Sequence, residues 1–115
     1  MKEYVFLYRA EFSGEIKLTP EGTLAVSKEW ENWFGGIAAQ NKLVSGGARL
    51  GNEGRSVKPG NVVTNGPYVE LKEMVGGLSV IRAESLEEAV GLAETCPILN
   101  VGGMVEVREI IPMNG

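Results

Sequence analysis

The first strand pattern of the chain constrains its fold more than any other feature. Residues 3–9 read EYVFLYR, and the alternation of side chains along a strand places the three aromatic residues on one face and Val5 and Leu7 on the other. A strand with two apolar faces is typical of the centre of a sheet that is covered on both sides. The fold must therefore supply a cover for each face of the sheet that contains this strand.

A helix that follows is predicted to supply one cover. Thr19 and Pro20 are typical of a helix start, because threonine caps the first turn and proline suits the first helical position. Asn41 is typical of a helix end. The Gly35-Gly36 pair weakens the helix by about 1 kcal/mol per glycine, and we expect it to let the helix approach another backbone closely. The apolar stripe of this helix, at the spacing i, i+4, i+7, i+8, consists of Val26, Trp30, Trp33, Phe34 and Ile37.

A second helix is predicted to begin at residues 85–88, SLEE, which have the form of a capping box. Pro97 is expected to stop this helix. Both helices carry a single apolar stripe, so both can cover the same face of a sheet. The stripe of the second helix consists of Leu86, Ala89, Val90 and Ala93.

Four further segments have the pattern of strands or hairpins. Residues 42–50, KLVSGGARL, predict a short strand with a bulge, and residues 55–64, RSVKPGNVVT, predict a hairpin that turns at KPGN. A Gly-Gly pair precedes a clear strand at residues 78–83, LSVIRA, and the last strand is predicted over residues 103–110, GMVEVREI.

The order of these elements predicts the fold class. Strand, helix, strand or hairpin, strand, helix and strand make the split β-α-β pattern of a ferredoxin-like α+β sandwich, with an antiparallel sheet and two helices on one face. We expect one domain over residues 1–115. The second apolar face of the first strand cannot stay in water, and we expect a homodimer in which two sheets pack face to face to cover it.

Composition excludes several classes of function. The net charge is −4 and the pI is near 4.9, which argues against a nucleic-acid partner because a phosphate-binding surface needs clustered Lys and Arg. The chain has no histidine, so neither Ser-His-Asp nor Cys-His catalysis is possible within it. Zinc would have to be bound by one cysteine and carboxylates, and no phosphate-binding loop motif is present. We therefore expect no metal and no cofactor.

The single cysteine and the N-terminus bear on the compartment. Cys96 excludes an internal disulfide framework, and it lies near a helix C-terminus, without the N-terminal dipole that activates a thiol, so we expect a structural role. The apolar run at the N-terminus is too short for a signal peptide, and no run approaches about 18 apolar residues. We expect a soluble, cytoplasmic protein.

The stretch 63–77, VTNGPYVELKEMVGG, resembles the signature of the YCII-related family with a DGPF motif. In that family a strand ends in T-D-G-P-F and is followed by E-x-K-E and a Gly-Gly pair. The matching residues in this stretch are Thr64, Asn65, Gly66, Pro67, Tyr68, Glu70, Lys72, Glu73, Gly76 and Gly77. The resemblance continues through Ser85, Leu86, Glu88, Ala89, Cys96, Pro97 and residues 105–108.

The resemblance implies a dimeric ferredoxin-like α+β barrel and little about activity. Some relatives carry a His-Asp pair that is proposed to be catalytic, and some DGPF members are linked to sigma factors by gene context. In this chain Asn65 replaces the motif aspartate and Tyr68 replaces the motif phenylalanine, and histidine is absent. A His-Asp mechanism therefore cannot be transferred to this chain.

Several polar residues are candidates for a site, and each has a simpler structural interpretation. Asn65 either closes a tight turn or lies at the mouth of a cleft. Glu70 and Lys72 are either solvated charges or, at strand-like i, i+2 spacing, a carboxylate and an ammonium on one face of a pocket. Glu106 and Arg108 share a strand face, where we expect either a salt bridge or an anion site.

Arg82 presents the same choice as Arg108. It lies in phase with Leu78 and Val80 on a strand that is predicted to be central, and a charged residue among apolar neighbours is rarely left unpaired. A guanidinium on such a face either pairs with a carboxylate of the protein or binds the carboxylate of a ligand.

The leading hypothesis is a small homodimeric protein that binds a polar or anionic ligand in a cleft between the sheet and the helix at residues 20–40. The candidate ligand-binding residues are Asn65, Tyr68, Glu70, Lys72 and Arg108.

Two alternatives come from other classes of function. The first is an enzyme that uses Glu70 or Glu73 as a base and Tyr68 or Lys72 as an acid. The second is a regulatory partner of the transcription machinery, which only the gene context of the resembling family suggests.

Overall fold

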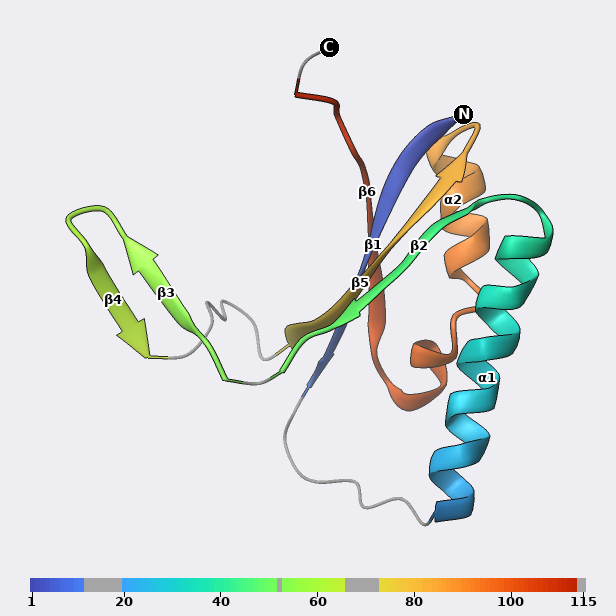
Figure 1. Ribbon diagram of the computed structural model, residues 1–115, viewed down its shortest axis with the longest axis horizontal. Helices are drawn as coiled ribbons and strands as arrows, with labels where there is room; N and C mark the ends of the chain where they lie inside the picture. The colour runs from blue at the N-terminus through green and yellow to red at the C-terminus, as the bar shows by residue number, and fades with distance from the viewer. Residues whose placement is uncertain (12–19, 52, 66–72, 114–115) are drawn as a thin grey trace.

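A four-stranded antiparallel sheet forms the centre of the protein (Figure 1). The structure is a computed structural model that describes residues 1–11, 20–51, 53–65 and 73–113. In chain order the elements are β1 (Lys2–Glu11), α1 (Pro20–Ala39), β2 (Leu43–Arg49), β3 (Arg55–Lys58), β4 (Val62–Asn65), β5 (Glu73–Ala83), α2 (Leu86–Ala93), the 3₁₀ helix η1 (Pro97–Val101) and β6 (Met104–Glu109).

The strand order is β2-β5-β1-β6, so β1 is central, as its two apolar faces predict. All three strand pairings are antiparallel, and the order is that of a split β-α-β fold. Both helices lie on the same side of the sheet (Figure 1). The structure thus confirms the α+β class with two helices on one face of an antiparallel, ferredoxin-like sheet.

The hydrophobic core lies between the sheet and the helices. Tyr4, Phe6 and Tyr8 of β1 are buried there against Trp33 and Ile37 of α1, as the sequence predicts. The rings of Phe6 and Trp33 stack with centroids 6.0 Å apart. The remaining buried apolar members of this core are Ile81, Ala83, Ala89, Ala93 and Cys96.

The ends of α1 agree with the sequence, but its glycines do not act as predicted. The helix begins at Pro20, while its predicted cap Thr19 lies outside the described residues. Asn41 has φ +58°, the left-handed conformation typical of a helix end. Gly35 and Gly36 are exposed, and a Cβ on either would have no atom within 4 Å. The expected close approach of another backbone is therefore wrong.

Helix α2 is capped as predicted, because Ser85 Oγ accepts a 3.2 Å hydrogen bond from the Glu88 amide. Its apolar stripe is only partly buried. Ala89 and Ala93 are buried, whereas Leu86 and Val90 are exposed. The small alanine side chains let this short helix lie close to the sheet.

Strand β5 is longer than predicted. It begins at Glu73, so Gly76 and Gly77 lie within the strand, where the register against β1 shifts between Tyr8 and Arg9. The two glycines were predicted to precede the strand. The irregularity instead lets the strand continue through them. The bulge predicted in β2 is confirmed by two register shifts between β2 and β5.

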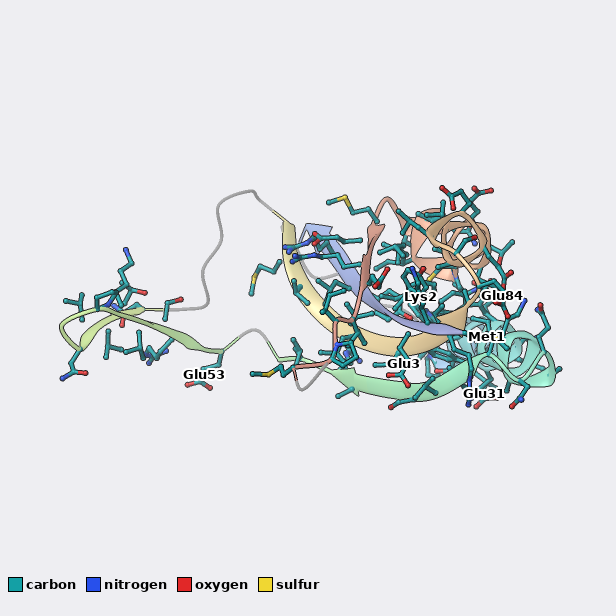
Figure 2. All side chains as sticks on the ribbon, turned by 90° about the horizontal axis from the view of Figure 1, so that it is seen from above. Met1, Lys2, Glu3, Glu31, Glu53 and Glu84 are labelled. Atoms are coloured by element: carbon teal, nitrogen blue, oxygen red, sulfur yellow. The ribbon has the colours of Figure 1, made fainter. Side chains whose placement is uncertain are left out.

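Strands β3 and β4 form the predicted hairpin, which is separate from the main sheet. Its turn contains Gly60 at φ +82° and Asn61 at φ +61°. Figures 1 and 2 both show this hairpin projecting away from the main sheet, on the side opposite the two helices. Among the described residues, no helix is both long and apolar enough to cross a membrane.

Candidate functional site

The sheet face that points away from the helices has an apolar centre. We call it the open face. Val5 lies opposite Val80 and Leu7 lies opposite Leu78 in the β1–β5 register, so these four side chains form adjacent pairs across two central strands. All four are half-buried in the isolated chain. The face on which the sequence predicted a second cover is therefore present, and neither helix covers it.

Two arginines lie beside this apolar centre. Arg108 of β6 is opposite Val5, and Arg82 of β5 is opposite Glu3. The Nε atom of Arg82 is buried and has no hydrogen-bond partner among the described residues. The ion pairs found in the described part of the chain include neither Arg82 nor Arg108.

Glu106, which shares the open face with Arg108, is paired with another arginine. Arg9 Nε donates to Glu106 Oε1 over 3.0 Å, on neighbouring strands and with both side chains partly buried. This contact confirms a salt bridge on this face for Glu106. It leaves Arg82 and Arg108 as the two guanidinium groups available there to an acceptor outside the described residues.

The sequence-predicted site residues fall into three groups. Tyr68, Glu70 and Lys72 lie outside the described residues, so the acid-base hypothesis that depends on them stays a prediction. Asn65 is exposed and ends β4, opposite Arg55 in the projecting hairpin.

Arg108 is exposed on the open face of the main sheet. β4, which ends at Asn65, and β6, which carries Arg108, belong to different sheets and lie apart (Figure 1), so the structure does not bring the two residues together. It also does not place Arg108 in the layer between the sheet and α1, where the sequence analysis expected the cleft.

A shallow hollow of about 370 Å³ does lie beside α1, against the segment that follows α2. The indole Nε1 of Trp33 donates 3.1 Å hydrogen bonds to Leu92 O and to Thr95 Oγ1, which hold this segment against the helix. None of the described residues that line the hollow is cationic. Its lining residues are Glu29, Asn32, Trp33, Thr95, Pro97 and Asn100.

The polar residues of this hollow were not predicted from the sequence. Thr95 and Asn100 flank Pro97, at the point where the predicted second helix stops, and this clustering of polar residues after a helix is the only local signal. Asn32 lines the same hollow but is more than 60 positions away in the chain, so its position near Thr95 and Asn100 depends on the packing of α1.

Two buried titratable groups belong to the core. Tyr8 donates a 2.9 Å hydrogen bond to Ser79, and burial raises the pKa of the Tyr8 hydroxyl above its ordinary value of 10.0. Burial also raises the pKa of the Cys96 thiol from 9.0 to about 11. Both groups are therefore protonated near neutral pH, and the buried Cys96 fits the structural role expected for it. The described residues contain no cluster of three or more His, Cys, Asp or Glu side chains that could hold a metal ion.

Comparison with known proteins identifies the family. A search of curated proteins finds no match. The sequence model of the YCII-related domain matches residues 17–114, which is most of the chain, and this agrees with the motif resemblance in residues 63–77. The chain belongs to the YCII-related domain family.

Proposed function

We propose that this protein is a homodimer that joins the open faces of two sheets and binds a small anionic ligand at Arg82 and Arg108. The dimer supplies the cover that the open face lacks in the single chain. The ligand supplies the acceptor that the two arginines lack among the described residues.

The apolar centre of the open face supports the dimer. Val5, Leu7, Leu78 and Val80 make a contiguous patch, and burial of apolar area contributes about 25 cal/mol per Å². A twofold axis through this patch would place the same residues of two copies against each other, as in most homodimers. The charged residues of the face would then lie around the apolar centre, where a polar rim is usual.

The observation that carries the ligand proposal is the buried Nε of Arg82, which has no partner among the described residues. A buried donor without an acceptor costs about 1–3 kcal/mol, and more if it is charged. The register places Glu3 directly opposite Arg82, yet no ion pair between them is found in the described residues. Because the Nε is buried, an external acceptor would pair with the accessible part of the Arg82 guanidinium, and a rotation of the side chain would bring the Nε to it as well.

The position of Arg108 favours a small ligand with two or more anionic oxygens. Arg108 of β6 is opposite Val5 of β1, and Arg82 of β5 is opposite Glu3 of β1. The two arginines therefore lie on the two neighbours of β1, opposite positions of β1 that are two residues apart on the open face. Guanidinium groups bind carboxylate and phosphate in a bidentate manner, and exclusion of water by the second copy would strengthen both contacts.

A thermal-shift titration tests the anion site. Purified protein is melted with succinate, with inorganic phosphate and with the uncharged diamide of succinate. A ligand at about 100 times its dissociation constant should stabilise the fold by about 2.7 kcal/mol. We expect stabilisation by at least one anion, no effect of the diamide, and loss of the effect in Arg82→Ala and in Arg108→Ala.

The matched control is Arg49→Ala, which removes an exposed arginine of β2 that lies opposite Gly77. It should keep the full shift. Arg82→Lys, which retains the charge but not the planar fork, should bind the anion more weakly than the wild type. An equal shift in Arg82→Ala and Arg49→Ala would contradict the proposed site.

The hollow beside α1 is a second candidate for ligand binding, favoured by its concave shape and polar lining. Asn32 and Asn100 offer amides and Glu29 offers a carboxylate, and the described lining contains no cationic side chain. This hollow therefore suits a neutral or cationic polar ligand. A stabilising compound of that kind whose effect is lost in Asn32→Ala, and kept in Arg82→Ala, would assign binding to the hollow instead of the open face.

A further inference from the structure

In the part of the chain that the structure describes, no layer covers the β3–β4 hairpin. It is a separate two-stranded sheet, and a hairpin of two strands is at best marginally stable by itself in water. Val57, Val62 and Val63 on it are 70%, 54% and 59% exposed. A second surface that packs on this hairpin would bury these side chains and stabilise it.

The valines are distributed over both sides of the hairpin. Val57 lies opposite Val63, so these two point to one side, whereas Val62 lies opposite Lys58 on the other side. The first side therefore carries an adjacent pair of exposed valines, which is the arrangement that favours a packed contact.

The direction of the hairpin suggests what packs on it. In Figure 1 the helices lie on one side of the main sheet and the hairpin lies on the other, and the view from above in Figure 2 shows the same arrangement. The hairpin thus extends on the side of the open face. A second copy seated on the open face would lie next to the hairpin.

The radius of gyration and the accessible surface area of the chain agree with a surface that a second copy covers. Its radius of gyration is 15.9 Å, whereas a compact domain of this length has about 13 Å. Its accessible surface is 8257 Å², whereas a monomer of this mass exposes about 6,100 Å². The excess of about 2,000 Å² is within the range of about 1,000–2,500 Å² that each chain buries in an obligate homodimer.

Charge also favours a second copy as the partner. Residues 55–65 contain Arg55 and Lys58 and no acidic residue, while the whole chain carries −4, so the rest of the chain is more acidic still. The basic hairpin of one copy is therefore complementary in charge to the body of another.

We propose that the β3–β4 hairpin is an arm that packs on a second copy of this chain, through the side that carries Val57 and Val63. Each subunit extends its arm along the subunit seated on its open face, so the two arms clasp the dimer reciprocally. The arm rests on the homodimer of the proposed function, and it adds an interface that the open face alone does not provide.

Photo-cross-linking tests the contact directly. The photoreactive residue benzoylphenylalanine replaces Val63 in the full chain, and equal amounts of ¹⁴N-labelled and ¹⁵N-labelled protein are mixed and irradiated. We expect cross-linked peptides that join light to heavy chains. The control places the same residue at Val101 in η1, which is 67% exposed and lies apart from the hairpin. If position 63 forms cross-links only within one chain, the proposed contact between the arm and a second copy is overturned.

Dimer affinity separates the arm from the open face. The double variant Val57→Asp/Val63→Asp should raise the dimer dissociation constant at least about tenfold, about 1.4 kcal/mol, in sedimentation equilibrium, whereas Val101→Asp should not change it. One combination of results would overturn the arm alone. In it the wild type dimerises, Val80→Asp dissociates the dimer, and Val57→Asp/Val63→Asp leaves the dimer dissociation constant unchanged.

The oligomeric states of the wild type and of Val80→Asp separate the arm from the proposed dimer. A monomeric wild type would overturn both the arm and the dimer of the proposed function. A dimer that Val80→Asp leaves intact, with Val63 cross-links between chains, would support the contact of the hairpin with a second copy but overturn its placement beside the open face. Circular dichroism of each variant shows whether the main sheet and the helices are retained.

Discussion

The Tyr8 hydroxyl donates a 2.9 Å hydrogen bond to Ser79 Oγ, in the buried layer between the sheet and the helices. Ser79 in turn donates over 2.8 Å to the Gly46 carbonyl. This chain of hydrogen bonds joins β1, β5 and the irregular part of β2. It satisfies a phenol and a hydroxyl that the core would otherwise leave without partners.

Removal of the central hydroxyl should therefore cost more than removal of the phenol. Ser79→Ala leaves both the Tyr8 hydroxyl and the Gly46 carbonyl without this partner, and we expect a loss of about 2–3 kcal/mol in the free energy of unfolding. Tyr8→Phe leaves Ser79 bonded to Gly46 and should cost about 1 kcal/mol. Urea denaturation measures both. A larger loss for Tyr8→Phe than for Ser79→Ala would contradict this order.

Gly47 and Gly46 offer a matched pair of substitutions in β2. Gly47 has φ +79°, and a Cβ there would overlap the Leu78 carbonyl. A Cβ on Gly46 would have no atom within 4 Å. We expect Gly47→Ala to destabilise the protein by more than about 2 kcal/mol and Gly46→Ala to change stability by less than about 1 kcal/mol. Equal melting temperatures of the two variants would show that the β2 bulge is not formed as described.

Cys96 should be unreactive until alkaline pH. Its side chain is 2% exposed, and burial raises the pKa of the thiol from 9.0 to about 11. Reaction with a thiol reagent at pH 8 should be at least about 100-fold slower than in the unfolded chain, because two pKa units reduce the thiolate fraction by that factor. Reaction at the rate of the unfolded protein would contradict this burial.

The same pKa shift predicts a loss of stability at high pH. The folded state favours the protonated thiol, so its contribution is fully present below pH 9 and is lost as the pH rises from 9 toward 11. Tyr8 acts in the same direction above pH 10, because burial raises the pKa of its hydroxyl. Cys96→Ala should therefore lose less stability than the wild type between pH 9 and pH 11, as followed by urea denaturation.

Much of the fold could be predicted from the sequence because it depends on local patterns. The two-faced alternation of β1 predicts its central place, and the SLEE motif predicts the Ser85 cap. The start of β5 was not predicted, because two consecutive glycines are typical of a turn. In the structure Gly76 and Gly77 instead lie at a bulge opposite β1.

The candidate sites could be predicted only in part. Arg82 and Arg108 are recognisable as charged residues among apolar neighbours, but only the β5-β1-β6 order shows that they lie on the two neighbours of β1. The hollow beside α1 depends on the approach of Asn32 to Asn100, which no local pattern contains. The hairpin was predicted correctly, but no local pattern in the sequence predicts its direction relative to the main sheet.

The ion pair between Lys42 and Glu88 predicts a loss of stability at acid pH. Lys42 Nζ lies 2.8 Å from Glu88 Oε1, and this contact lowers the pKa of the Glu88 carboxyl below 4.5. Its stabilising effect is present above pH 4.5 and is lost as the pH falls through the lowered pKa of the folded state. In Lys42→Met the NMR titration midpoint of Glu88 should rise, whereas in the exposed control Lys28→Met it should not. An unchanged midpoint in Lys42→Met would show that the pair is absent in solution.

The molar mass of the protein in solution tests the central claim most directly. Light scattering on the eluting peak of a size-exclusion column, at micromolar concentration, should give about twice the chain mass of 12.4 kDa for the wild type. Val80→Asp, which places a charge in the apolar centre of the open face, should give a folded species of 12.4 kDa. A wild type of 12.4 kDa, or a Val80→Asp variant that remains a dimer, would contradict the open face as the interface on which this account rests.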